Sequence, residues 1–490
     1  MLTKKTLRII ALLMSIILML SGFAGCKRVE DTGSDIVEEI IEIVPGETVI
    51  EGTDSTTNQI ADNNSGGNAN PTTNNASSTN SKDLKGATVT IAAWGSSDVS
   101  PQPTDEDYAE KKKLIATIEK KYNCKIKFKS IEHWGAYTSA LNAALASGTH
   151  FADIVSATTS WVFPTNLIKG YILPLDSYLN LNDPMFNKKM MNACTYKGKH
   201  YLMMKSNDYS GGMGLYINKK VFNICGVTDL PEKYVSSSNW TWDTFRALAQ
   251  KLTKSVNGTQ YYGFASSGLA TTTRYLSASN GTYGFLTSKN NRQYFNGNDP
   301  KFIKTIQFVY DLYNKDKIMP DVKDAATLWE NGRVAMMTGS ASSYDVGVAA
   351  AAIGAENLAF TYLPLGPDTK EYTYSRSEAT CYFMPKTVKN PEIIAQIMKE
   401  YYYPYKWADK SIEEVSEGLF NDETSGAVAL DTLRHSNDYY SFGPLYSYIT
   451  NTVMWGDYGI TKQTSPQSYI ASVQATAEQE LNSTWKGYEK

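Results

Sequence analysis

Metal ligands, reactive thiols and catalytic signatures are scarce in this sequence of 490 residues. It has four His and five Cys, no pair of cysteines has CxxC spacing, and HExxH does not occur, so neither a redox motif nor a metal site is indicated. The P-loop and GxSxG signatures are missing as well. We therefore expect no cofactor and no enzyme activity, although 50 acidic residues leave room for the paired carboxylates of a glycosidase.

The chain also lacks a strong charge of either sign. It carries 47 basic and 50 acidic side chains, so a general basic surface for DNA or RNA is not expected. Aromatic residues, in contrast, make up 12% of the chain, and 33 of them are tyrosines. Tyr and Trp suit a surface that is both apolar and hydrogen-bonding, so the positions of these rings are informative.

Long apolar runs are absent, and the one near the N-terminus is too short for a membrane span. Residues 9–20 are apolar apart from Ser15 and follow a basic stretch, which is typical of a secretory signal peptide. Small residues then precede Cys26 and resemble the lipobox of bacterial lipoproteins, with Phe23 where Leu is usual. We expect residues 1–25 to be removed and Cys26 to carry lipid (palmitate among the acyl chains). The alternative is a plain signal peptide with an incidental Cys.

The segment after Cys26 has little that could form a core. Residues 30–51 are acidic, and residues 53–83 consist mostly of Asn, Thr, Ser and Gly. Such a composition cannot bury enough apolar surface to offset the entropy of ordering. We therefore interpret residues 26–85 as a disordered tether, and the chain as held at the extracellular face of the bacterial cytoplasmic membrane by its lipid alone.

Four cysteines remain in the folded part: Cys124, Cys194, Cys225 and Cys381. They allow two disulfides in three pairings, or none. Without a recognisable spacing, the interpretation we favour is free, buried thiols.

The first part of the fold alternates between strand and helix patterns. Residues 87–94 form a run of small and β-branched residues, residues 125–129 alternate strictly, and residues 151–155 are apolar apart from Asp153, so three strands are predicted. Apolar residues at helical spacing fill residues 105–122 and 134–148 between them. This order predicts an α/β fold with a parallel sheet and helices on both of its faces.

Ligands of open α/β sheets bind beyond the carboxyl ends of the strands. Each of the three predicted ends carries a Trp together with polar side chains. The candidates there are Trp94 and Ser96, His133 and Trp134, and Thr159 and Trp161. For any one of these Trp residues, packing in the core is the more common role, but three at three strand ends favour a mixed aromatic and polar cleft.

A series of segments resembles the extracellular solute-binding proteins of carbohydrate ABC importers, the maltose-binding-protein-like group. The segments, in the order expected for that group, are KKYNCKIKF (120–128), LNAALASG followed by ADIV (141–148 and 152–155), GKHY (198–201), LYINKKVF (215–222), NWTWDTF (239–245) and NGRVAMM (331–337). Ala152 replaces the usual Pro. The resemblance covers about residues 86–400.

The resemblance implies a two-lobed periplasmic-binding-protein-like fold with the ligand cleft between the lobes. Lobe 1 would comprise residues 86–206 and 362–405, and lobe 2 residues 207–361 and 406–490. Helical patterns near residues 301–314, 391–402 and 467–481 fit this division, and residues 215–222 are expected to be a strand. Thr241 has the properties of a helix N-cap, so Trp242 and Asp243 are interpreted mainly as structural residues.

The same resemblance adds candidate ligand residues from the segments that cross between lobes. They are Asp208 and Tyr209 at the first crossing, Arg376 and Glu378 before the strand at 380–384, and Trp455 in a late aromatic segment. A solvated or salt-bridged surface is the alternative for Asp208, Arg376 and Glu378. One departure concerns residues 339–344, where the group often has Gly closely followed by Trp. Here a stacking ring is missing unless Tyr344 replaces it.

Taken together, the sequence predicts a surface lipoprotein that captures a carbohydrate, with an oligosaccharide favoured, by closure of its lobes. The protein would be a monomer. It would deliver the sugar to the permease subunits of an ABC importer, which a separate ATPase powers. The alternatives are a binding protein for another solute, such as a peptide or a polyamine, or a sensor, and less favoured, a carbohydrate-active enzyme.

Overall fold

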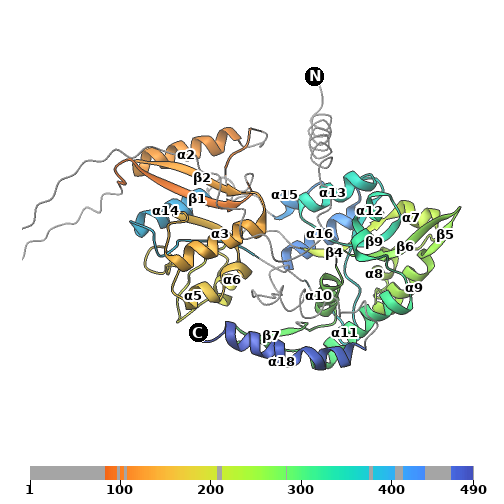
Figure 1. Cartoon of the computed structure of the whole chain (residues 1–490). Helices are drawn as coiled ribbons and strands as arrows, with labels where there is room; N and C mark the ends of the chain where they lie inside the picture. Colours follow the sequence, from red (N-terminus) through yellow and green to blue (C-terminus); the bar gives the residue numbers. More distant parts are fainter. Residues whose placement is uncertain are drawn as a thin grey trace, which may run out of the picture. The chain divides into compact units, whose positions relative to one another are not determined.

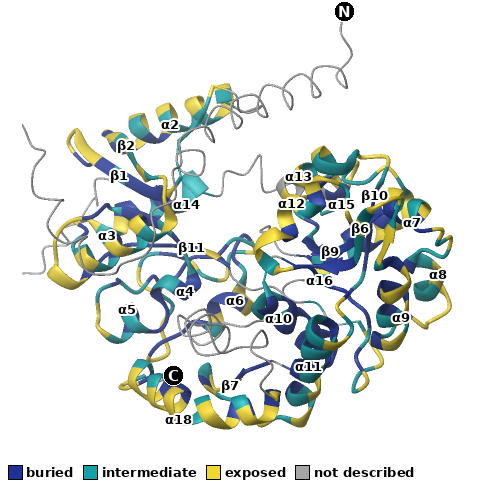
Figure 2. Ribbon diagram, turned by 45° about the vertical axis from the view of Figure 1, so that its right-hand side comes forward, coloured by how far each residue is buried: buried dark blue, intermediate teal, exposed yellow. Residues whose placement is uncertain are grey.

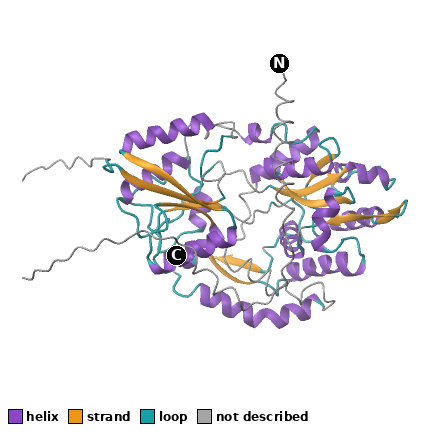
Figure 3. Ribbon diagram, turned by 45° about the horizontal axis from the view of Figure 1, so that its top comes forward, coloured by secondary structure: helices purple, strands orange, loops and turns teal. Residues whose placement is uncertain are grey.

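The computed structural model describes residues 83–95, 100–103, 108–206, 212–266, 268–282, 284–372, 374, 379–402, 412–435 and 465–488. Within them the strands form a four-stranded sheet of order β11-β3-β1-β2, a five-stranded sheet of order β10-β4-β9-β6-β5, and a hairpin β7-β8. Helices flank both sheets (Figures 1 and 3), as the α/β prediction requires.

The four-stranded sheet lies in the segments expected to form the first lobe. Its elements are β1 (Ala87–Trp94), α2 (Tyr108–Tyr122), β2 (Cys124–Ile131), α3 (Trp134–Ser147), β3 (Ile154–Thr158), α4 (Thr159–Val162), α5 (Thr165–Ile168), α6 (Lys188–Ala193), β11 (Thr380–Phe383) and α14 (Pro391–Tyr402). Strand β1 pairs in parallel with both β2 and β3, so the predicted parallel arrangement of the first three strands is confirmed. Strand β11 joins the edge of β3 in the antiparallel sense.

The small and β-branched residues of β1 place it inside the sheet. Val89, Ile91 and Ala92 are buried, and the register with β2 runs from Ala87 opposite Cys124 to Trp94 opposite Ile131. The following helix α3 ends at Gly148, whose φ of 74° is the left-handed conformation that glycine adopts without steric cost. Sequence spacing therefore located these two elements to within one or two residues.

Strand β3 begins later than predicted, at Ile154 rather than near Phe151. Asp153 accounts for the difference, because its carboxylate accepts the backbone N–H of Thr90 at 2.8 Å while its own N–H donates to the Thr90 carbonyl at 2.9 Å. A side chain therefore replaces one rung of the ladder between β1 and β3.

The five-stranded sheet lies in the segments expected to form the second lobe. Its part of the chain contains β4 (Met213–Asn218), α7 (Lys219–Ile224), α8 (Pro231–Ser236), α9 (Trp242–Leu252), β5 (Lys254–Val256), β6 (Thr259–Ala265), α10 (Leu269–Ser279), β7 (Leu286–Lys289), β8 (Arg292–Phe295), α11 (Pro300–Tyr310), the π-helix Asp311–Lys315, the 3₁₀ turn Val322–Asp324, α12 (Ala325–Glu330), β9 (Val334–Ser340), α13 (Ser343–Ile353), β10 (Leu358–Thr361), α15 (Ile412–Ser416), α16 (Glu423–His435) and α18 (Pro466–Thr484). The helical patterns at 301–314, 391–402 and 467–481 thus correspond to α11 with its π-turn, to α14 and to α18.

The prediction of one strand over residues 215–222 was wrong in its second half. Strand β4 ends at Asn218, whose side chain accepts the backbone N–H of Val221 and so begins helix α7. A capping side chain overrode the apolar character of the residues that follow.

The interpretation of Trp242 as a structural residue is confirmed. Thr241 forms a capping box with Thr244 at the start of α9, and Asp243 lies in the first turn. The Trp242 ring is buried and stacks on Phe308 of α11, with ring centroids 4.4 Å apart and planes 5° apart. This stacking joins α11 to α9, which in turn packs on β6.

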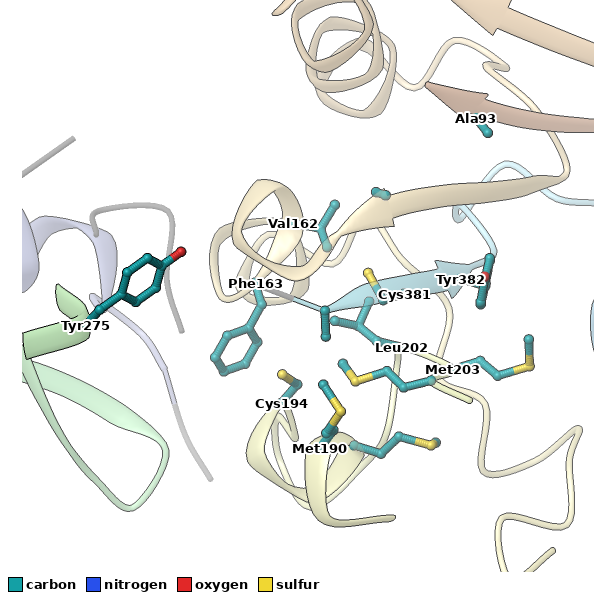
Figure 4. Close-up of a cluster of buried hydrophobic side chains, with 14 of the residues drawn as sticks. Ala93, Val162, Phe163, Met190, Cys194, Leu202, Met203, Tyr275, Cys381 and Tyr382 are labelled. Atoms are coloured by element: carbon teal, nitrogen blue, oxygen red, sulfur yellow. The ribbon is translucent and has the colours of Figure 1, made fainter. Parts of the chain in front are cut away.

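The core is well packed, and its thiols are part of it. Dark, buried ribbon follows the central strands of both sheets in Figure 2, whereas the outer faces of the helices are exposed. Cys124, Cys194, Cys225 and Cys381 are all free and buried, which confirms the interpretation of them as core thiols. Figure 4 shows Cys194 and Cys381 among the apolar side chains of Met190, Leu202 and other residues. Burial raises the pKa of both thiols.

Several predictions fall on residues that the structure does not describe. These are the signal peptide, Cys26 and the tether up to residue 82, and the lobe limits expected at 206–207 and 405–406, which fall beside or within residues 207–211 and 403–411. The third limit, expected at 361–362, lies among the described residues, but nothing in the structure tests it. They stay predictions. No helix among residues 83–488, as far as they are described, has the length and apolarity to cross a membrane.

Candidate functional site

The carboxyl edge of the first sheet brings two of the predicted tryptophans together. Trp94 ends β1, Trp161 lies in α4 just after β3, and their ring centroids are 6.3 Å apart in an edge-to-face arrangement. The indole N–H of Trp94 donates to the Glu132 carbonyl at the end of β2, at 2.9 Å. The three strand ends therefore meet, as the parallel order of the strands predicted.

A buried tyrosine packs against one member of this pair, Trp161. Tyr137 of α3 is fully buried, lies 6.1 Å from Trp161 between ring centroids, and donates its hydroxyl to the Ser156 carbonyl at 2.8 Å. Burial raises the pKa of Tyr137 far above its usual value, so the phenol stays a neutral donor. We call Trp94, Tyr137 and Trp161 the aromatic edge.

The members of the aromatic edge differ in their access to solvent. The Trp94 side chain is 42% exposed and Trp161 is half-buried, whereas Tyr137 has no exposed surface. The exposed Trp94 ring is available to a ligand. Covering it would remove apolar surface from water, which is favourable in free energy.

His133 and Trp134 form a separate, more exposed pair beside the end of β2. Their ring centroids are 5.9 Å apart with planes 22° apart, and Trp134 is 56% exposed. His133 is the N-cap residue of α3, but its side chain makes no capping hydrogen bond. The structure thus keeps these two rings on the surface and does not use them as core.

Thr159 is the remaining described candidate, and it has the opposite environment. It is 1% exposed, its backbone N–H donates to the Ala379 carbonyl at 3.0 Å, and its Oγ1 is buried with no hydrogen-bond partner among the described residues. A buried hydroxyl without a partner costs about 1–3 kcal/mol. A group that supplied a donor or acceptor there would recover this free energy.

The other candidates lie outside the described residues. They are Ser96, Asp208, Tyr209, Arg376, Glu378 and Trp455. Their roles stay predictions.

Gly339, expected to follow the strand at 331–337, lies inside β9 instead, and the structure shows why a glycine is needed there. A Cβ atom added to Gly339 would lie 2.2 Å from the ring of Tyr216, so no side chain fits without displacing that ring. Tyr216 is buried, and its hydroxyl donates to the Ser340 carbonyl. Tyr344 lies at the start of α13, and the description of the structure does not extend to its side chain.

A second polar and aromatic group was not predicted from the sequence. Tyr362 follows β10, and its hydroxyl donates at 2.9 Å to Oδ2 of Asp431 on α16. Tyr374 donates to the same oxygen, and its ring stacks on His435 with centroids 4.9 Å apart. Tyr372 stacks on Tyr362 with centroids 4.2 Å apart. We call these five residues the Asp431 cluster.

Burial dominates the electrostatics of the Asp431 cluster. It raises the pKa of Tyr372 to about 12, and together with the hydrogen bonds to Asp431 it raises the pKa of Tyr362 and Tyr374 further. Because the carboxylate accepts two phenols and lies beside His435, its role is to hold the segment after β10 against α16. The alternating Tyr372 and Tyr374 were visible in the sequence, but nothing near Asp431 indicated that all of these residues meet.

A hollow between α15 and α16 has a different character. Its charged lining residues are all acidic, and its one ring, Phe420, packs on Phe360. The acidic residues are Glu413, Glu414, Glu417, Asp422 and Glu423. Among the described residues, no group of three or more His, Cys, Asp or Glu side chains is arranged to hold a metal ion. This hollow therefore offers neither a flat ring for a sugar nor a metal site.

Comparison with known proteins identifies the family. The sequence profile described as bacterial extracellular solute-binding protein matches residues 100–402, which is more than half of the chain. The chain belongs to this family of extracellular solute-binding proteins. Members of the family are binding proteins and not enzymes. No protein of curated function matches this solute-binding protein.

Solved structures similar to this solute-binding protein have the same two-lobed fold. The GacH receptor of Streptomyces glaucescens, determined unliganded and with acarbose, is 16% identical with a TM-score of 0.58, covering 82% of this chain and 100% of its own. The ABC substrate-binding protein of Listeria monocytogenes in complex with cycloalternan is 17% identical with a TM-score of 0.57, at the same coverages. Maltose-bound MalE3 of T. maritima is 15% identical with a TM-score of 0.57, covering 80% of this chain and 100% of its own. The predicted two-lobed fold is thus confirmed.

Proposed function

We propose that this solute-binding protein captures a carbohydrate, most favourably an oligosaccharide, and delivers it to the permease subunits of an ABC importer. The observation that carries the proposal is the aromatic edge, with an exposed Trp94 and a half-buried Trp161 at the carboxyl ends of parallel strands. The same short helix as Trp161 carries the buried Thr159 hydroxyl, which has no hydrogen-bond partner among the described residues. Sugar rings have apolar faces and a rim of hydroxyls, so this combination of rings and polar atoms matches them.

The similar structures support the same ligand class. Three of them were determined in complex with cycloalternan, acarbose and maltose. At 15–17% identity they share the fold with this chain, so the ligand itself has to be established by binding. Capture would proceed by closure of the two lobes on the sugar, with contacts from both.

The direct test is a thermal-shift and calorimetric screen of the full chain against mono- and oligosaccharides, with peptides and spermidine as the competing classes. A ligand bound by the folded state alone raises the apparent melting temperature. We expect an oligosaccharide to raise the melting temperature. Trp94→Ala and Trp161→Ala should each weaken its binding roughly two- to tenfold, because stacking on a ring contributes about 0.5–1.5 kcal/mol. Tyr294→Ala removes a comparably exposed ring from strand β8 and is the matched control. Binding of spermidine or a peptide without any sugar would overturn the proposal.

We further propose that Cys26 carries the lipid that keeps the protein at the extracellular face of the cytoplasmic membrane, behind the tether of residues 26–85. The lipobox-like residues before Cys26 support this. Cys26→Ser should move the protein from the membrane fraction to the medium and abolish labelling by palmitate. Retention at the membrane would contradict it.

A purely binding role is tested separately. Incubation of the purified protein with oligosaccharides should yield no new reducing ends, and turnover would contradict a purely binding role.

A further inference from the structure

Helix α18 packs on the second lobe along one face. Ile470, Ala477 and Leu481 lie on that face and are buried, and the helix contacts β8 and α11. Polar contacts reinforce the packing, since Arg292 of β8 donates to the Asn482 side chain at 3.1 Å. Because α11 stacks on α9 through Phe308, α18 is connected to the five-stranded sheet through packed rings.

The residues directly after α18 pack on the first lobe instead. Trp485 is 1% exposed, and its ring meets Phe163 edge-to-face with centroids 5.5 Å apart. Tyr488 meets the same phenylalanine at 5.9 Å and nearly perpendicular, and it lies 5.9 Å from Tyr196. Phe163 is one of the buried side chains that Figure 4 shows near Cys194 and Met190, so the tail reaches the core of the first lobe.

Two hydrogen bonds fix the tail in this position. The Tyr488 hydroxyl donates to the Thr195 carbonyl at 2.6 Å, and the Tyr196 hydroxyl donates to the Gly487 carbonyl at 3.3 Å. Gly487 has a φ of 82°, a conformation that residues with a Cβ rarely adopt, and it brings the backbone close to Ile168 of α5. The turn between Trp485 and Tyr488 is therefore shaped to bring both rings onto Phe163.

The hairpin β7-β8 makes a second, independent contact with the same place. Its turn, Asn290 and Asn291, has positive φ at both residues. The Asn291 amide donates to the Asn192 carbonyl at 2.7 Å and to the Thr195 hydroxyl at 3.2 Å. Thr195 is thus contacted by both the tail and the hairpin. The tail and the hairpin both belong to the second lobe, whereas Thr195 belongs to the first.

We propose that the tail of residues 485–488 and the Asn290–Asn291 turn form an interlobe pivot, a non-covalent joint about which the two lobes rotate when the cleft closes. Perpendicular rings that are buried against each other resist sliding, because sliding would open voids in a packed core. Rotation about the contact keeps it intact. The pivot would thereby restrict the ligand-free protein to a narrow range of lobe orientations, and its effect on ligand affinity rests on the sugar-binding function proposed above.

The test measures lobe motion without ligand, by the distance between two spin labels in the full chain carrying Cys26→Ser. Lys113→Cys on α2 and Lys251→Cys on α9 provide exposed labelling sites, one on each lobe, while the native thiols are buried. We expect Trp485→Ala to broaden the ligand-free distance distribution and Asn291→Ala to broaden it less. Lys486→Ala, an exposed change in the same tail, is the matched control and should leave it unchanged.

A freer ligand-free protein loses more conformational entropy when it closes, so affinity for the sugar should fall, roughly fivefold for Trp485→Ala. Asn291→Ala removes the hydrogen bonds of one half-buried side chain and no packed ring, so it still tests the pivot if Trp485→Ala does not fold. A distribution that stays as narrow as the parent's in every folded variant would overturn the proposal. So would tighter sugar binding, since closure would then have to break these contacts. If neither the parent protein nor any variant binds sugar, the proposed function fails. The spin-label distances, measured without ligand, still show whether the pivot restricts lobe motion.

Discussion

Removing the carboxylate of Asp431 should loosen the segment that follows β10. Tyr362 and Tyr374 both donate to its Oδ2 atom, and a hydrogen bond to a charged acceptor contributes about 1.5–3 kcal/mol. The Asp431 side chain is 31% exposed, so solvent screening places each bond at the lower end of that range. We therefore expect Asp431→Ala to lower the free energy of unfolding by about 2–3 kcal/mol. Asp431→Asn keeps an acceptor oxygen and should cost about 1 kcal/mol.

Urea unfolding followed by tryptophan fluorescence measures these differences. Combining Asp431→Ala with Tyr374→Phe in a double-mutant cycle should give a coupling free energy of about 1 kcal/mol, because the two changes remove the same bond. Asp324→Ala is the control, since Asp324 is exposed and makes no side-chain cap bond at the start of α12. If Asp431→Ala costs no more than this control, the carboxylate does not hold the segment and the reasoning is refuted.

Three further predictions test the core. The pKa of Tyr122, raised to about 12 by burial and by its hydrogen bond to Glu400, lies above its unfolded value near 10. The contribution of protonated Tyr122 to the free energy of unfolding should therefore be fully present below pH 10. It should be lost as the pH rises through 12, by up to about 2–3 kcal/mol. Tyr122→Phe should remove this part of the loss of stability at alkaline pH. Gly339→Ala should cost about 1–3 kcal/mol, seen as a lower melting temperature, because the Tyr216 ring has to move; an unchanged melting temperature would contradict the packing. Trp242→Ala should cost about 3–5 kcal/mol in urea unfolding, and a loss under 1 kcal/mol would be inconsistent with its stacking on Phe308.

The first lobe was predictable because its signals are local. Residues 87–94 are apolar and β-branched in one run, and Gly148 ends a helix through its own backbone conformation, so neither depends on distant parts of the chain. The start of β3 and the end of β4 were misplaced for the opposite reason. In both, one polar side chain, Asp153 or Asn218, takes a backbone hydrogen bond that apolar periodicity does not reveal.

The part of the candidate site that follows from the order of the strands was predictable from the sequence, and the rest was not. Parallel order brings Trp94 and Trp161 together, and the sequence was sufficient to infer that order. The Asp431 cluster joins positions 69 and 57 residues apart, and nothing local marks such a pairing. The partner of Trp485 was equally invisible, because Phe163 lies on the other lobe of the chain.

The four buried thiols bear on how the protein matures after export. A fold that depends on disulfides has to wait for an oxidant outside the cell, and it can be trapped with the wrong pairs. Here each cysteine fills space in the core as a small apolar residue, and burial suppresses the thiolate of Cys194 and Cys381 that would react. Folding of the described part therefore requires no disulfide, and its four thiols are shielded from oxidants once it is folded.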